Sequence, residues 1–163
     1  MLFRSRRDVA AALDRLAADV APSEQAVVCH GDLHPFNILD RGGVMVVIDW
    51  TGAIVADPCF DVAFTELLLA NPPLALPRQL APVAAAAGRL LARRFISAYT
   101  RANPGVALDR LEWFRALHSA RVLIEVTTLR TTHGPDAGGH PLATVAPAAA
   151  RNLAAATGVT VRP

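Results

Sequence analysis

The chain has 163 residues, of which 53% are hydrophobic and 18% are charged, and its formal net charge is +2. This length and composition are typical of one globular domain, and so small a charge, with its arginines scattered, argues against a nucleic-acid partner. No apolar run reaches the roughly 20 residues of a membrane span, and the two cysteines form no disulfide or metal pattern, so we expect a cytoplasmic protein with no membrane partner.

The first part of the chain is predicted to form one helix and one strand. Ser5 and Asp8 have the spacing of a helix cap, and apolar residues then recur at helical spacing as far as Pro22. The β-branched run at 26–29 predicts a short buried strand. This strand leads directly into a stretch rich in polar side chains.

That stretch reads HGDLHPFN and occupies residues 30–37. The apolar segments that follow it predict a β-hairpin over 38–48, with a three-residue turn at 41–43. In this register residue 37 lies opposite residue 47. The hairpin therefore returns the chain to the polar stretch from which it started.

The rest of the chain is predicted to be helical. Apolar residues at helical spacing predict helices over 60–70, 83–102, about 109–132 and 142–157. A glycine–proline loop at 134–141 separates the last two helices, and Pro147 is expected to kink the final helix or delay its start. Gly158 is expected to end it.

Three oxygen-bearing side chains are expected to converge at one end of the hairpin. Asp32 lies on the loop that leads into the hairpin, Asn37 lies at its start, and Asp49 follows its second strand. Mg²⁺ prefers oxygen ligands and keeps several waters, so Asn37 and Asp49 could hold it while Asp32 stays free. A free carboxylate near a metal-bound phosphate is suited to accept the proton of a hydroxyl group, as phosphoryl transfer requires.

The same stretch allows a second interpretation. If it were an extended strand, His30, Asp32 and His34 would share one face and could bind a transition metal for hydrolysis. Pro35 and the spacing of the other polar residues favour a loop instead. Trp50, which follows the hairpin, is expected to pack in the core.

The stretch HGDLHPFNIL, followed by VIDW, resembles the catalytic core of the aminoglycoside phosphotransferase and choline kinase family. The fold of that family is similar to that of protein kinases. The spacing His30-x-Asp32-x-x-x-x-Asn37 matches the kinase catalytic loop, and Asp49 stands where kinases have Asp-Phe-Gly. The resemblance continues through an Asp-Pro pair and a helix that opens with aspartate, to about residue 63.

The resemblance implies an enzyme that transfers the γ-phosphoryl group of ATP, or of another nucleoside triphosphate, to a hydroxyl group of a small molecule with Mg²⁺. It also assigns roles to particular side chains. The catalytic base is Asp32, the metal ligands are Asn37 and Asp49, the supports of the loop are His30 and Asp61, and the candidate phosphate or substrate contacts are His34 and Asp57.

We expect a predominantly α-helical α+β fold over 1–163, with a catalytic core at 27–63 and a helical remainder at 64–158. It corresponds to the carboxy-terminal lobe of a kinase-like enzyme. The amino-terminal nucleotide lobe is expected to be absent, because only about 25 residues precede the core and the chain has no lysine to pair with phosphates.

This expected absence leaves two functional alternatives open. The isolated chain could be incomplete as an enzyme and pair with a second copy or with a separate chain that supplies the nucleotide lobe. It could also be a catalytically silent binding or scaffold remnant that keeps the fold.

Overall fold

The computed structural model describes residues 2–20, 25–74, 76–77, 79–133 and 140–161. The elements run α1 (Leu2–Ala18), β1 (Val27–Cys29), η1 (Pro35–Asn37), β2 (Ile38–Arg41), β3 (Val44–Val47), η2 (Trp50–Gly52), β4 (Ile54–Ala56), α2 (Cys59–Ala70), α3 (Ala81–Ala102), α4 (Leu111–His133), η4 (Pro141–Thr144) and α5 (Ala146–Thr157), where η marks a 3₁₀ helix. The fold is mostly helical with a small β content, which confirms the predicted α+β class.

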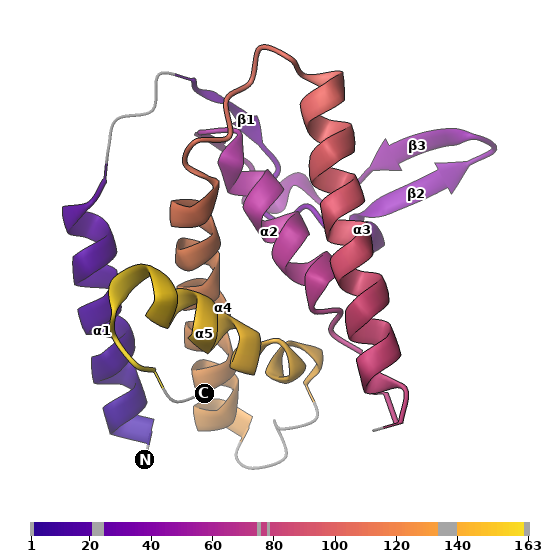
Figure 1. Cartoon of the computed structure of the whole chain (residues 1–163). Coiled ribbons are helices and arrows are strands. Elements are labelled where there is room, and N and C mark those ends of the chain that lie inside the picture. The colour runs from indigo at the N-terminus through magenta and orange to yellow at the C-terminus, as the bar shows by residue number, and fades with distance from the viewer. Residues whose placement is uncertain (1, 21–24, 75, 78, 134–139, 162–163) are drawn as a thin grey trace.

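Helix α4 is the centre of the helical part, with α1, α2 and α5 packed around it (Figure 1). The buried face of α1 consists of Val9, Ala12 and Leu16, which recur at helical spacing and pack against this core. Helix α2 lies between α4 and α3, so it is apolar on most of its surface. The core is closed from the other side by α5, whose alanines allow close packing.

Helix α3 packs against α2 and otherwise leaves much of its surface exposed to solvent. Gly88 makes the close approach possible, because a Cβ at this position would lie only 2.5 Å from the carbonyl oxygen of Leu69. The contact places the α3 backbone directly beside the end of α2.

Two separate pairs of antiparallel strands flank the helices, and the β2–β3 hairpin extends away from them (Figure 1). The predicted hairpin is present, but its register differs by one residue from the prediction, since Ile38 pairs with Val47. The turn has two residues, Gly42 and Gly43, with φ values of 66° and 89°. These left-handed conformations suit a tight two-residue turn, and Arg41 extends the strand instead of entering the turn.

The other β pair was only half predicted. Strand β4 was missed, and it pairs with β1 so that Val28 lies opposite Val55. The prediction that the first strand is buried is wrong for two of its three residues, because Val27 is 42% and Val28 is 69% exposed. Only Cys29, at the end of the strand, is buried.

The helix boundaries agree with the predictions to within a few residues. Helix α1 begins at Leu2, so Ser5 lies within it and does not cap its start. Pro147 lies in the first turn of α5, behind a short 3₁₀ helix, which confirms that it delays the start of this helix. Gly158, at φ 69°, ends α5 as predicted. Residues 134–139 of the predicted glycine–proline loop lie outside the described residues.

No helix in the described ranges combines the length and the apolar character needed to cross a membrane.

Candidate active site

The loop between β1 and β2 is held from two sides. Asp61, in the first turn of α2, accepts hydrogen bonds from the backbone N–H groups of His30 (2.6 Å) and Gly31 (2.9 Å). The buried ring of His30 donates from Nε2 to the carbonyl of Ile48 (2.7 Å), and its Nδ1 accepts the N–H of Asp32 (3.2 Å). The two side chains therefore tie the loop to α2 and to the end of the hairpin.

Gly31 allows the loop to pass close to η2. Its φ is +83°, and a Cβ at this position would overlap the carbonyl oxygen of Gly52. Any other residue would therefore meet both backbone strain and a steric clash. Trp50 covers the neighbouring His30 ring at a centroid distance of 4.8 Å. The prediction that Trp50 packs in the core is wrong, because its side chain is 51% exposed.

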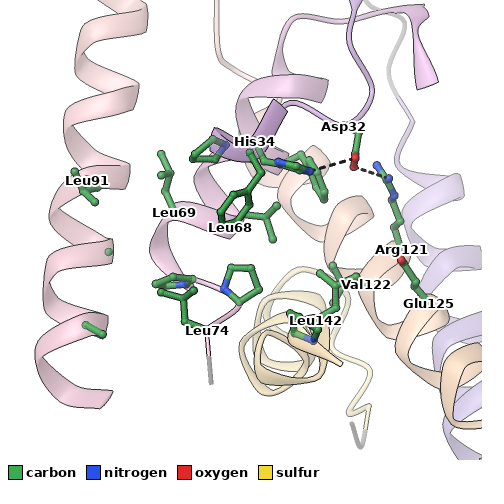
Figure 2. A pocket seen from close by; sticks show the side chains of 18 of the residues that line it. Asp32, His34, Leu68, Leu69, Leu74, Leu91, Arg121, Val122, Glu125 and Leu142 are labelled. Carbon is green, nitrogen blue, oxygen red and sulfur yellow. Dashed lines mark hydrogen bonds and ion pairs between the residues drawn. The ribbon is translucent and has the colours of Figure 1, made fainter. Parts of the chain in front are cut away.

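Asp32 carries the carboxylate that the sequence singled out, and the side chains of Arg121 and His34 approach it (Figure 2). Arg121 Nη2 lies 3.0 Å from Oδ1, and His34 Nε2 lies 3.4 Å from Oδ2. The carboxylate still keeps 37% of its surface exposed. It is therefore oriented by its neighbours and remains accessible to a small molecule.

Arg121, on α4, was missed in the sequence analysis. Its Nη1 donates to the carbonyl of Gly31 (2.7 Å), and its guanidinium lies 4.7 Å from the ring centre of Phe64. One side chain thus fixes both the loop backbone and the Asp32 carboxylate. A signal was present, because Arg121 follows Phe114 by seven residues and so interrupts the apolar face of its helix.

The side chain of Asn37 lies at the start of the hairpin with its orientation fixed. Its Nδ2 donates to the carbonyl of Asp32 (2.9 Å), and the residue is 8% exposed. The amide oxygen is therefore the atom of this side chain that is available to bind a cation. The backbone carbonyl of Asn37 accepts the N–H of Ile48 (2.9 Å), so the true partner of residue 37 is residue 48 and not residue 47.

Asp49 follows directly and leaves the hairpin in a left-handed conformation, with φ and ψ both at 61°. Within the described ranges it is the only residue other than glycine with a positive φ. The residue is exposed, and its Oδ1 accepts the Thr51 hydroxyl (2.7 Å), which leaves Oδ2 available. Asp49 therefore directly follows Ile48, the residue that pairs with Asn37, although the register differs from the prediction.

Asp57 contacts Cys59 and Arg110 at the start of α2 and lies apart from Asp32, Asn37 and Asp49 in these contacts. It is 8% exposed, its Oδ1 accepts the N–H of Cys59 (2.8 Å), and Arg110 lies 3.6 Å from Oδ2. Asp32 and His34 line a cavity between α2, α3, α4 and η4, and Asp57 is not among its described lining residues. These contacts give Asp57 a structural role at the start of α2, and its predicted contact with substrate stays a prediction.

Burial determines the protonation of three groups near the loop. It raises the pKa of the Cys29 thiol to about 11, with Asp61 adding to the effect, and that of Cys59 to about 12. Burial also lowers the pKa of His118 to about 4, and the nearby Arg121 contributes in the same direction. At neutral pH both thiols are therefore protonated and His118 is uncharged.

No group of three His, Cys, Asp or Glu side chains among the described residues is arranged to hold a metal ion. Both ring nitrogens of His30 already contact the backbone, so the His30, Asp32 and His34 cluster of the hydrolase interpretation is not assembled. A magnesium site made from one amide and one carboxylate is a different donor set. Asn37 and Asp49 each keep an oxygen for it.

A cavity of about 730 Å³ opens beside the loop, between α2, α3, α4 and η4. Asp32, His34 and Arg121 lie at one end of it, and apolar side chains form most of the remaining wall (Figure 2). This volume falls within the range of about 300–1,000 Å³ that is usual for small-molecule sites. The accessible carboxylate therefore faces a space that can hold a small ligand.

A model described as the phosphotransferase enzyme family (APH) matches residues 2–102, a range that includes the whole loop and both strand pairs. No curated protein and no solved structure matches the chain.

Proposed function

The chain belongs to the phosphotransferase enzyme family, as its catalytic-loop residues predicted, and on this premise we propose that it transfers the γ-phosphoryl group of ATP, or of another nucleoside triphosphate, to a hydroxyl group of a small molecule. The observation that carries the proposal is the accessible carboxylate of Asp32 at the end of a cavity of small-molecule size.

In this proposal Asp32 is the catalytic base. Its Oδ1 is held by Arg121 at 3.0 Å, whereas Oδ2 lies 3.4 Å from His34, beyond the usual range of a strong hydrogen bond. Oδ2 is therefore the oxygen that accepts the hydroxyl proton. The alcohol oxygen forms the new bond to the γ-phosphorus, the bond to the β-phosphate oxygen breaks, and the nucleoside diphosphate leaves.

Asn37 and Asp49 would hold Mg²⁺, since each presents one oxygen that its other contacts leave available. Bound Mg²⁺ supplies positive charge that offsets the charge of the transferring phosphoryl group. The buried hydrogen bond from Asn37 to the Asp32 carbonyl links the metal ligand to the base, so both keep a constant spacing.

His34 is the candidate contact to phosphate. Its ring lies beside Asp32 on the same wall of the cavity, and its Nδ1 is buried without a hydrogen-bond partner in the described part of the chain. An imidazole N–H at this position can donate a hydrogen bond to an oxygen of the phosphoryl group.

The decisive experiment replaces Asp32 by asparagine, which keeps the shape and removes the base. Transfer of labelled γ-phosphate from ATP to an alcohol, with Mg²⁺ present, should fall by about 10²–10⁴-fold. Asp14→Asn is the matched control, because Asp14 is an exposed aspartate on α1, away from the loop. Retained transfer in the Asp32→Asn variant would contradict the assignment of the base.

A catalytically silent binding domain is the second candidate. The observation that favours it is that each oxygen of Asp32 already has a side-chain neighbour, Arg121 at Oδ1 and His34 at Oδ2. In that case the unaltered chain transfers no phosphate above the background rate, and Asp32→Asn changes nothing in the same assay.

A further inference from the structure

The cavity beside Asp32 is apolar over most of its depth. Leu68 of α2 lies on one side, Leu91 of α3 faces it, and Leu142 of η4 lies below (Figure 2). Phe64 of α2 also lines the cavity. Two of these side chains, Phe64 and Leu68, are at least nine-tenths buried. A ligand that enters therefore exchanges water for hydrocarbon along most of its length.

The charged groups of the cavity lie together near Asp32. Arg121 and His34 flank that carboxylate, and Glu125 lies one turn further along α4. Asp32 is already paired with Arg121, so Glu125 is the one other carboxylate among the described lining residues. An ammonium group that lies against Leu68 and Leu91 would be away from both Asp32 and Glu125 (Figure 2), and burial of an unpaired charge is costly.

Resting on the proposed function, we propose that the acceptor is an uncharged alcohol with a predominantly apolar body. Its hydroxyl group lies at Asp32 Oδ2, and its body runs along the wall formed by Leu68, Leu91 and Leu142. Polyamines and amino sugars are disfavoured as acceptors, because the described lining residues offer only Glu125 besides Asp32 to pair with their several charges.

Leu91 supplies a specific test of this arrangement. The side chain is 54% exposed and lines the cavity, so a ligand that covers it removes a large apolar group from water. Its neighbour Leu90 is 52% exposed on the same helix but does not line the cavity. The two leucines therefore form a matched pair, in which only one position faces the ligand.

The experiment compares two ligands of one shape, phenylbutanol and phenylbutylamine, by NMR titration of the full chain without nucleotide. The alcohol is expected to bind at least about fivefold more tightly than the charged amine. Leu91→Glu should weaken binding of the alcohol by at least about fivefold and favour the amine, because it places a carboxylate on the apolar wall. Leu90→Glu should change neither affinity.

Equal or tighter binding of the amine would overturn the proposal, as would undetectable binding of the alcohol. An unchanged affinity of the alcohol for the Leu91→Glu variant would also overturn it. The comparison of ligands needs no variant and no catalysis, so it is independent of the Asp32→Asn assay. If phenylbutanol binds as expected but receives no phosphate, the proposed function fails, while the preference of the cavity for the uncharged alcohol over the charged amine stands.

Discussion

The buried ring of His118 should make the protein lose stability as the solution becomes mildly acidic. His118 is 1% exposed and lies against the rings of Phe60 and Phe64, at centroid distances of 4.5 and 5.1 Å. Its Nε2 donates to the carbonyl of Phe60 (2.8 Å), and Arg121 adds positive charge on the same helix. Burial and this charge lower the pKa of His118 to about 4, against the partly offsetting attraction of Asp32.

The size of the effect follows from the two pKa values. Above pH 6.5 the ring is neutral in both states, so its titration does not alter the free energy of unfolding. Below pH 6.5 the unfolded chain takes up a proton that the folded chain refuses until about pH 4. The folded state therefore loses stability as the pH falls between these values, by roughly 3 kcal/mol in all, since each pH unit is worth about 1.4 kcal/mol.

Urea unfolding of the unaltered chain and of His118→Gln at pH 7.5 and 4.5 measures this contribution. Glutamine can still donate to the Phe60 carbonyl but does not titrate, so its cost is the same at both pH values. On going from pH 7.5 to pH 4.5, the free energy of unfolding of the variant should therefore rise by roughly 2–3 kcal/mol relative to that of the unaltered chain. His140→Gln is the control and should keep the pH dependence that His118 imposes. An equal difference at both pH values would refute the reasoning.

Two further predictions concern the loop. Gly31→Ala should lower the free energy of unfolding by more than about 2 kcal/mol in urea, because the new Cβ meets the Gly52 carbonyl as well as an unfavourable φ. Gly43→Ala has a similar φ of +89° but open space around it, so it should cost only about 1 kcal/mol, and equal costs would count against the clash. Arg121→Gln should lower the kcat of phosphate transfer by at least about tenfold with a smaller change in KM, because it releases the Asp32 carboxylate without removing it. A change confined to KM would show instead that Arg121 contacts the acceptor.

Much of the local structure followed from short-range features of the sequence. Proline and glycine mark the start and end of α5 because their backbone preferences act at their own positions. The predominantly helical character and the family could be predicted for the same reason, since helical periodicity and the spacing of Asp32, Asn37 and Asp49 are properties of contiguous residues. The kinase-like lobe, the missing nucleotide lobe and the cytoplasmic location stay predictions.

Only the tertiary structure decided how these parts meet. The register of the hairpin depended on which residues adopt a left-handed φ, and β4 becomes a strand only by pairing with β1. Arg121 lies 89 residues from Asp32 in the chain, and the walls of the cavity come from five elements that are separate in sequence. Such contacts arise from packing of the whole core, and the identity of neighbouring residues does not specify them. The sequence by itself determined the reactive groups Asp32, Asn37 and Asp49. The packing of α2, α3 and α4 decided that Arg121 and an apolar cavity lie beside Asp32.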